Sequence, residues 1–325
     1  MINEDKIKAI KNKLDRCAKS FEPDENRIIT AQALLESQEE ELPSLLDPLI
    51  PKLGIGAIVG GSDTGKSALL RQLALAICAG DHEFLGLKLT PTHKSVVFAC
   101  TEDDQSTVKK LMRKQIDGKG YKSTWENLRF MFDVDTHSLL EKLDQELTQN
   151  PADMVILDAF GDLFTKDINK STEVRKYLDS YFTLAKKHQC VILYLHHTSK
   201  RTEYLPPSKN NVMGSQGFES KLRFIFEIRQ DPMFAYKKHL CITKANHLAS
   251  EWKNKSIEMT FDQHLLFSPT GERVAFADLV VQNPADANNE NNLQYDVDWK
   301  EVFDKRKEIR HTELVKDLTD WYGMS

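Results

Sequence analysis

Hydrophobic and polar positions follow two different patterns along this chain. Between residues 53 and 197, short apolar runs alternate with segments in which apolar residues recur every three or four positions. The runs predict buried strands, and the recurring positions predict helices. The runs at 54–60, 96–100, 154–158 and 191–195 are almost continuously apolar, which is typical of parallel strands covered on both faces. We therefore expect an α/β fold with a mostly parallel sheet flanked by helices.

The pattern changes after residue 197. A segment rich in Pro, Gly, Ser and Asn predicts a loop, and strand-like segments follow it at 222–229, 239–246, 256–262 and 264–270. We expect these strands to be antiparallel neighbours that close the C-terminal edge of the sheet.

The same pattern divides the chain into parts. Helical periodicity at 3–20 and 28–46 predicts an N-terminal helical segment and linker, and polar residues without periodicity predict a flexible linker near the other end. The predicted parts are the N-terminal segment 1–45, the α/β domain 46–282, the linker 283–296 and a short C-terminal helical segment 297–325, with helices near 297–308 and 311–321.

Composition and charge limit the cellular environment and the classes of partner that we expect. The 325 residues carry a formal net charge of −5 and a pI of about 6.1, and this acidic balance does not indicate nucleic-acid binding. It does not exclude such binding, because a ring-shaped assembly could concentrate a few basic loops in its channel. The five cysteines include no C-x-x-C pair and predict reduced thiols. No apolar stretch reaches the roughly 18 residues of a membrane span, and the charged N-terminus has no signal-peptide core. We expect a cytoplasmic protein without a membrane partner.

A phosphate-binding motif follows the first strand of the sheet. Residues 60–67 read GGSDTGKS, which fits G-x-x-x-x-G-K-[ST] between a predicted strand and a predicted helix. In this motif backbone N–H groups surround phosphate oxygens, the lysine reaches the β- and γ-phosphates, and the hydroxyl binds Mg²⁺. The sequence therefore predicts a nucleoside triphosphate site with Mg²⁺. Its predicted contacts are Gly60, Gly61, Ser62, Asp63, Thr64, Gly65, Lys66, Ser67 and Ala68.

Acidic residues follow two other strands. Asp158 ends an apolar run, where a second Mg²⁺ ligand beside Ser67 is expected, although an ordinary strand-end aspartate has the same pattern. Glu102 is the best candidate for the general base that polarises the attacking water, with Asp103 and Asp104 as alternatives. Asp104 is the most suitable of the three acids for capping the next helix.

His196 and His197 end the strand at 191–195. A polar side chain there could bind the γ-phosphate or the water and report hydrolysis to the loop that follows. A histidine pair in a strand is also a common structural feature. No third ligand lies at metal spacing, so we do not expect zinc.

Five segments occur in the order GGSDTGKS, TEDD, MVILDAF, LHHTSK and GSQGFESKLRF. Together they resemble the RecA-like ATPases, most closely the RepA type of hexameric replicative DNA helicase in the AAA_25 family, over roughly residues 28–262. The resemblance implies a RecA-like core, ATP and Mg²⁺ as cofactors, and a homo-oligomer, as a hexameric ring. It implies catalytic roles for Lys66 and for Glu102 as the catalytic glutamate, a Mg²⁺ ligand in Asp158, and a γ-phosphate sensor in His197. It also implies that Arg223 is an arginine finger donated to the neighbouring subunit.

The chain departs from this family in one motif. Related proteins carry a K-x-R pair on a late strand as their finger, whereas this chain has residues 244–246, Lys-Ala-Asn. That difference moves the finger to Arg223, with Lys221 as a possible partner. An exposed arginine at the end of an amphipathic strand is the alternative.

Two basic loops are candidates for contact with single-stranded DNA. One is Gly161–Ser171 with Lys166 and Lys170, and the other is Lys200–Asn211 with Lys200, Arg201, Tyr204 and Lys209. Both are also compatible with plain surface loops.

The resemblance predicts a helicase of plasmid or mobile-element replication, with a replication initiator or another protein as a possible partner. The alternatives are an ATP-dependent assembly switch without unwinding activity, a filament-forming recombination factor and a metabolic phosphotransferase.

Overall fold

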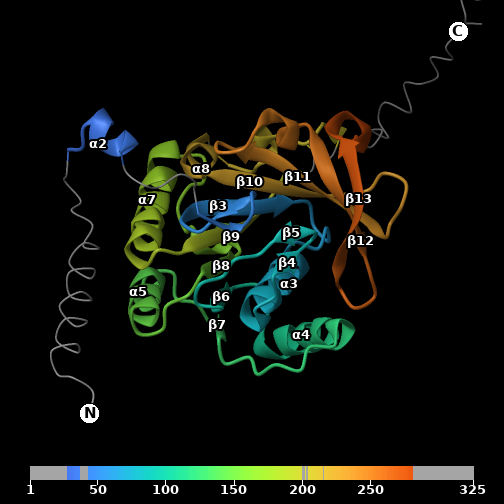
Figure 1. Ribbon diagram of the computed structural model, residues 1–325, viewed down its shortest axis with the longest axis horizontal. Coiled ribbons are helices and arrows are strands. Elements are labelled where there is room, and N and C mark those ends of the chain that lie inside the picture. Colours follow the sequence, from blue (N-terminus) through green and yellow to red (C-terminus); the bar gives the residue numbers. More distant parts are fainter. Residues whose placement is uncertain (1–27, 37–42, 200–201, 203, 215, 281–325) are drawn as a thin grey trace, which may run out of the picture. The chain divides into compact units, whose positions relative to one another are not determined.

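The computed structural model describes residues 28–36, 43–199, 202, 204–214 and 216–280 (Figure 1). The chain divides into two compact units, residues 1–42 and 43–325. In the first unit the described part holds a short helix, α2 (Ala31–Leu35). The helix expected over 28–46 does not extend to its predicted end, because the second unit has strand β1 (Ser44–Leu46) there. The expected elements at 3–20, 283–296, 297–308 and 311–321 lie outside the described residues.

A nine-stranded sheet forms the centre of the second unit, in the order β13-β12-β11-β10-β3-β9-β8-β6-β7. Six of its strands are mutually parallel, and β11, β12 and β13 continue the sheet antiparallel. This confirms the α/β prediction with antiparallel strands at the C-terminal edge. The strands are β3 (Gly54–Gly60), β6 (Val96–Cys100), β7 (Leu128–Met131), β8 (Met154–Asp158), β9 (Val191–His197), β10 (Phe224–Gln230), β11 (Lys237–Ala245), β12 (Lys255–Phe261) and β13 (Phe267–Ala275).

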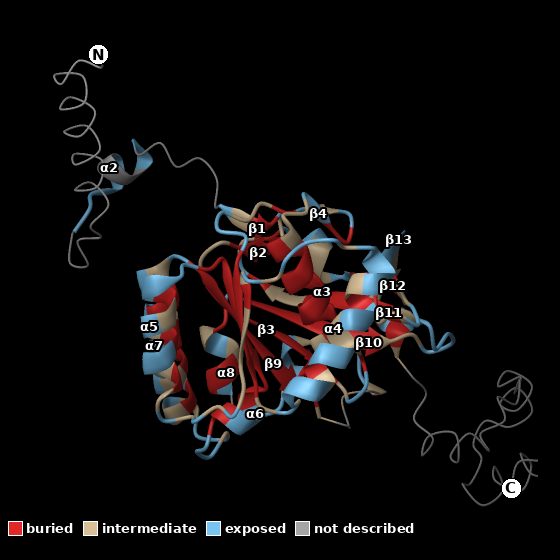
Figure 2. Ribbon diagram, turned by 90° about the horizontal axis from the view of Figure 1, so that it is seen from below, coloured by how far each residue is buried: buried red, intermediate tan, exposed pale blue. Residues whose placement is uncertain are grey.

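Helices cover both faces of the parallel strands, so alternate residues of each strand enter two separate cores. On β8, for example, Ile156 packs in the core that contains α3, whereas Val155 and Leu157 pack in the core that contains α5 and α7. Figure 2 shows α3 and α4 on one side of the buried strands and α5 and α7 on the other. The helices are α3 (Lys66–Ala79), α4 (Gln105–Lys119), α5 (Leu139–Gln149), α6 (Phe160–Leu163), α7 (Ser171–His188) and α8 (Gln216–Lys221).

Strand β10 is antiparallel to β11, as expected, and is parallel to β3 on its other side. Two details differ from the sequence-based expectation. The last strand begins at Phe267, after a turn at residues 262–266, and ends at Ala275. The predicted loop 161–171 overlaps α6 at its start. Smaller elements are β2 (Ile50–Pro51), β4 (Glu83–Phe84), β5 (Leu87–Lys88), η2 (Lys209–Asn211), η3 (Ser250–Lys253) and η4 (Phe276–Leu279).

Strand register brings the polar strand ends together. Gly60 of β3 lies opposite His197 of β9, and Cys100 of β6 lies opposite Asp158 of β8. All four strands are parallel, so the segments that follow them meet at the carboxyl edge of the sheet, where α/β proteins bind ligands. Among the residues that the structure describes, no helix combines the length and apolar character needed to cross a membrane.

Candidate functional site

The phosphate-binding motif forms a tight connection between β3 and α3. Two of its glycines have no room for a side chain: a Cβ at Gly60 would lie 2.6 Å from the Ile228 carbonyl oxygen, and one at Gly65 would lie 2.7 Å from the Phe267 ring. Gly65 also has φ = 91°, in the left-handed region that favours glycine. The loop is therefore held between the start of α3 and the neighbouring strands, with the helix N-terminus directed toward it.

Lys66 begins α3 and is only 6% exposed. Its ammonium donates a 2.7 Å hydrogen bond to the Gly61 carbonyl, which also accepts a 3.0 Å bond from the Thr64 hydroxyl. Burial lowers the pKa of Lys66, and the nearby carboxylates of Glu102 and Asp158 oppose that shift. The structure thus places a buried cation at the phosphate loop, where the sequence predicts it.

Asp158 ends β8 beside Ser67 and is buried. Burial raises the pKa of its carboxyl group to about 6, and a hydrogen bond with Ser67 acts in the opposite direction. Its Oδ1 atom has no hydrogen-bond partner among the described residues. A buried carboxylate oxygen without a partner, next to a hydroxyl, is the oxygen donor set that Mg²⁺ prefers. The residues present therefore fit the Mg²⁺ ion that a phosphate loop implies.

Glu102 and His197 meet across the carboxyl edge of the sheet. His197 Nε2 lies 3.5 Å from Glu102 Oε1, and both side chains are partly exposed. Thr101 ties the base of this segment to β8, because its N–H donates to the Asp158 carbonyl at 2.7 Å and its hydroxyl accepts from the Ala159 N–H at 2.9 Å. The structure therefore brings three predicted site residues, Glu102, Asp158 and His197, to the same edge.

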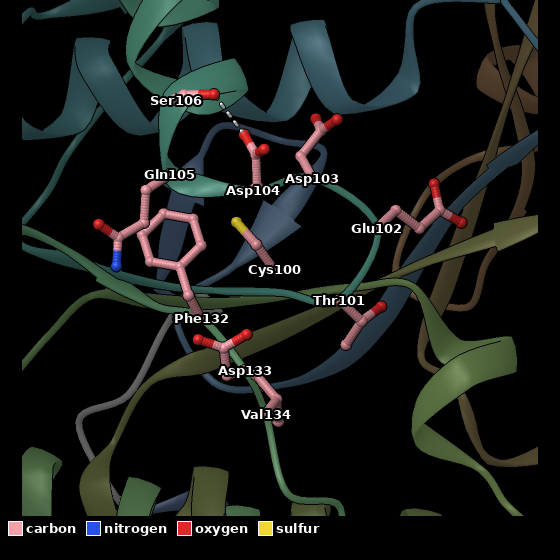
Figure 3. Close-up of a pocket in the computed structure, with 10 residues that line it drawn as sticks. All are labelled: Cys100, Thr101, Glu102, Asp103, Asp104, Gln105, Ser106, Phe132, Asp133 and Val134. Atoms are coloured by element: carbon pink, nitrogen blue, oxygen red, sulfur yellow. Dashed lines mark hydrogen bonds between the residues drawn. The ribbon is translucent and has the colours of Figure 1, made fainter.

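The other two acids after β6 have different surroundings. Asp104 caps α4, as predicted, by accepting a 2.7 Å hydrogen bond from the Thr107 N–H. Asp103 Oδ2 lies 3.8 Å from an Nη atom of Arg71. A cavity of about 590 Å³ lies beside this segment and is lined by residues 100–106 and 132–134. Figure 3 shows that the Glu102 side chain points away from the other residues that line it. Among the three acids, Glu102 is the one that faces His197.

Arg71 belongs to the site, although the sequence-based interpretation passed over it. It lies one turn into α3 from the phosphate loop and is 4% exposed. Burial lowers its pKa, and Asp103 and then Asp158 oppose that shift. One signal was available: α3 is apolar on nearly all sides, so the few polar residues of such a helix need partners inside the protein.

His196 points away from the phosphate loop. It is 2% exposed, and its Nε2 atom lies 3.0 Å from the Met213 carbonyl oxygen. Its ring packs against Phe160 and Phe218, with ring centroids 5.0 and 4.9 Å apart. Burial lowers the pKa of His196 to about 4. This histidine is a neutral core residue, so the two histidines of β9 have different surroundings.

Arg223 lies near the amino ends of the parallel strands, whereas the phosphate loop follows the carboxyl end of β3. Its N–H donates to the Ile55 carbonyl at 2.9 Å, near the start of β3, whereas the loop follows the end of that strand, about 20 Å away at 3.3 Å per residue. Its exposed guanidinium lies 5.7 Å from the centre of the Phe182 ring, and no described carboxylate pairs with it. Arg223 therefore cannot reach the phosphate loop of its own chain.

The predicted partner of Arg223, Lys221, is engaged elsewhere in an ion pair with Asp179. At the late-strand position that has no arginine, Lys244 lies 3.0 Å from the carboxylate of Glu219. Phe224 lies opposite Ala245, so Arg223 is close to the late-strand position at which related proteins carry their K-x-R pair.

The candidate DNA loops are only partly basic at their surfaces. In the first, Lys166 forms a 2.7 Å ion pair with Glu173, while Lys170 is exposed. In the second, Lys209 lies 3.2 Å from Glu219, and Tyr204 is half-buried. Lys200 and Arg201 lie outside the described residues.

Asp231, His239 and Glu258 form a further group of potential metal ligands away from the phosphate loop. Each already has a partner: His239 Nε2 lies 2.8 Å from Asp231, and Lys237 lies 3.1 Å from Glu258. Because these atoms are already engaged by protein partners, we assign no metal to the group.

Comparison with known proteins agrees with this geometry. The sequence model of the AAA_25 family, described as an AAA domain, matches residues 22–203, more than half of the chain. No curated protein matches. Among solved structures, one described as an ATPase domain superimposes with a TM-score of 0.52 at 13% identity, over 67% of this chain and 84% of that chain. A match at this identity speaks for the fold, and it confirms the RecA-like core predicted from the sequence.

Proposed function

The chain belongs to the AAA_25 family of AAA domains, and we propose that it is a Mg²⁺-dependent ATP hydrolase that works as an oligomer on single-stranded DNA. The observation that carries this proposal is the meeting of Lys66, Asp158 and the Glu102–His197 contact at one edge of the sheet. A cation for phosphate, a carboxylate for Mg²⁺ and a base for water are the parts that phosphoryl transfer to water requires.

Binding of the triphosphate uses groups already directed at the loop. The Lys66 ammonium exchanges its bond to the Gly61 carbonyl for the β- and γ-phosphate oxygens. Backbone N–H groups of residues 61–67 surround the phosphates at the positive end of α3. Asp158 and Ser67 would hold Mg²⁺, which would supply positive charge to neutralise the phosphates.

Hydrolysis needs a base that is in contact with water. Glu102 is partly exposed and accepts the proton of the attacking water, while His197 beside it senses the γ-phosphate. Strand β9 ends at His197, and the candidate DNA loop begins three residues later. Any displacement of His197 on loss of the γ-phosphate therefore reaches that loop directly.

The finger for the transition state is proposed to come from a neighbouring subunit. Arg223 is about 20 Å from its own phosphate loop, but it is exposed at the opposite edge of the sheet. In a head-to-tail oligomer that edge faces the loop of the next subunit. Arg223 then neutralises transition-state charge in trans, and a closed hexameric ring is the arrangement we propose.

Within this class we propose a RepA-like helicase of plasmid or mobile-element replication, acting in the cytoplasm with a replication initiator as a possible partner. A second function is an ATP-dependent assembly switch that does not unwind DNA. The pairing of Lys166 and Lys209 with glutamates favours the switch, because it leaves fewer free cations for a DNA backbone.

Two measurements on the full chain separate these functions. Mass in solution, with and without ATP and single-stranded DNA, tests assembly, and ATP turnover with and without DNA tests coupling. The helicase proposal requires a closed oligomer and DNA-stimulated turnover. An oligomer whose turnover ignores DNA would contradict the helicase and leave the switch, and open helical assemblies would contradict the ring.

A further inference from the structure

A buried ion pair lies on β10, outside the residues that we assign to nucleotide chemistry. Arg229 Nε donates to Glu227 Oε1 at 2.6 Å, and the two side chains are 8% and 2% exposed. Burying two charges costs free energy that their attraction repays only partly, so such a pair is weak evidence of a stabilising role. Its other contacts indicate what the pair does.

Arg229 binds the first half of the loop that connects β9 to α8. One Nη atom donates to the Leu205 carbonyl at 2.5 Å, and the other donates to the Thr202 carbonyl at 2.9 Å. The planar fork of a guanidinium fixes both directions at once. This part of the loop therefore takes its position from β10.

Glu227 binds the second half of the same loop. Its Oε2 atom accepts from the Ser208 N–H at 3.2 Å and from the Asn211 side-chain amide at 3.4 Å. Asn211 is itself 4% exposed and donates to the Pro206 carbonyl at 3.1 Å. One ion pair thus contacts both halves of the loop, with four hydrogen bonds to its described residues.

The two ends of the loop are joined at the predicted sensor strand. Thr198 and Val212 form a β-bridge, and the Met213 N–H donates to the His197 carbonyl at 3.1 Å. A cavity of about 220 Å³ reaches from the phosphate loop to the ion pair, with Gly61, Thr64 and Thr198 in its lining. The pair therefore lies between the phosphate loop and the body of the β9–α8 loop.

We propose that Glu227 and Arg229 are positioning residues that hold the described part of the β9–α8 loop, residues 202 and 204–212, on the carboxyl end of β10. Strand β10 pairs with β3 up to Gly60, where the phosphate loop begins. The β9–α8 loop and the phosphate loop are therefore attached to two neighbouring, paired strands. The mechanical part of this proposal stands on the contacts alone. Its consequence for DNA rests on the proposed function.

The double variant Glu227→Leu/Arg229→Met tests the mechanical part, because it removes the loop contacts without leaving an unpaired buried charge. Limited trypsin digestion of the full chain, followed by mass spectrometry, measures cleavage after Lys209 inside the loop. We expect cleavage about tenfold faster, because protease attack follows the population of the released loop. Cleavage after Lys170, in a different exposed loop, is the internal reference and is expected to keep its rate. Wild-type cleavage at Lys209 in the double variant would overturn the proposal.

A matched control removes another ion pair from the same sheet. Lys237→Met/Glu258→Leu acts on β11 and β12, which do not contact the β9–α8 loop through this pair. We expect wild-type cleavage at Lys209 in this control. Equal acceleration in both double variants would assign the effect to general loosening of the sheet and overturn the proposal.

The ratio of DNA-stimulated to unstimulated ATP turnover tests the consequence for DNA. We expect this ratio to fall toward one in the double variant of Glu227 and Arg229 and to stay at the wild-type value in the control. If DNA stimulates the wild-type protein, a released loop with an unchanged ratio in the variant would overturn the consequence for DNA. If wild-type turnover ignores DNA while cleavage at Lys209 still accelerates in the variant, the DNA proposal fails and the anchoring is supported.

Glu227→Gln serves if the double variant does not fold. It keeps the side-chain shape and an acceptor oxygen but loses the charge that pairs with Arg229. We expect a smaller increase in Lys209 cleavage, in the same direction, and no increase would overturn the proposal.

Discussion

His197 Nε2 and Glu102 Oε1 lie 3.5 Å apart, although 95 positions separate the two residues in the sequence. His197 ends β9, and Glu102 follows the end of β6 by two residues. Parallel strand order explains the contact, since β6, β8, β9 and β3 present their carboxyl ends at one edge. The contact also distinguishes Glu102 from its two acidic neighbours. Asp104 caps α4, and Asp103 faces Arg71.

Glu102→Gln is expected to bind ATP but to lower turnover by about 100-fold or more, the usual range for loss of a general base. The amide keeps the size of the side chain and cannot take a proton from water. Nucleotide binding and steady-state hydrolysis, measured on the same preparation, check this. Asp103→Asn is the matched control and is expected to keep most of the activity. Near-normal turnover in Glu102→Gln would assign the base elsewhere.

Asp158→Asn is expected to stabilise the protein in the absence of nucleotide and Mg²⁺, while abolishing Mg²⁺-dependent hydrolysis. Burial raises the pKa of Asp158 to about 6 from a reference value of 3.8, so the native state holds the proton more strongly than the unfolded state. The ionised carboxylate therefore costs stability in full above pH 6 and nothing well below pH 3.8. We expect a gain of about 1–3 kcal/mol at pH 7.5 that disappears by about pH 4. Urea unfolding at the two pH values checks it, and a destabilised variant at the higher pH would contradict it.

His196 is expected to make the protein sensitive to acid. Burial lowers its pKa to about 4 from a reference value of 6.5, so between these values the unfolded state binds a proton that the native state does not. Its contribution to stability is present above pH 6.5 and is lost as the pH falls toward 4. In His196→Gln, the loss of unfolding free energy between pH 7 and pH 4.5 should be smaller than in wild type by about 2 kcal/mol. Equal losses in the two proteins would place the acid-sensitive group elsewhere.

The trans arrangement of Arg223 predicts complementation. Arg223→Ala and Lys66→Ala each leave a homo-oligomer without a complete site, but a mixed interface can pair an intact phosphate loop with an intact finger. Mixing the two inactive proteins is therefore expected to restore part of the turnover, with a maximum at intermediate ratios. Lys221→Ala, which loses only the ion pair with Asp179, is the control and should remain active without mixing. No recovery at any ratio would argue against Arg223 as the finger.

The sequence predicted the parts of the fold that rest on local pattern. Buried parallel strands read as continuous apolar runs, and the Asp104 cap and the phosphate loop each depend on residues close in the sequence. The antiparallel order of β10 to β13 was confirmed, whereas the parallel pairing of β10 with β3 was not predicted, because an apolar strand does not show which strand will lie beside it. The length of β13 was missed because its exposed half is polar.

The contacts that were missed join residues far apart in the chain. Arg71 looks like an ordinary polar position of a helix until the burial of α3 on nearly all sides is known. Glu227 and Arg229 alternate along β10 like a solvent-facing pattern, yet the β9–α8 loop covers them. The sequence did not show which of the two adjacent histidines is buried. Successive residues of a strand point to opposite faces of the sheet, and only the tertiary structure shows what covers each face.

The most direct test of the account is steady-state ATP hydrolysis by the full chain, with Mg²⁺ and with single-stranded DNA present, beside the Lys66→Ala variant. Lys66 is the buried cation of the phosphate loop, and its replacement removes the charge that binds the β- and γ-phosphates. We predict Mg²⁺-dependent turnover by the wild-type protein and background turnover by the variant, with both proteins folded by circular dichroism. Equal turnover in the two proteins, or none in wild type, would contradict the assignment of this loop as an ATP hydrolysis site.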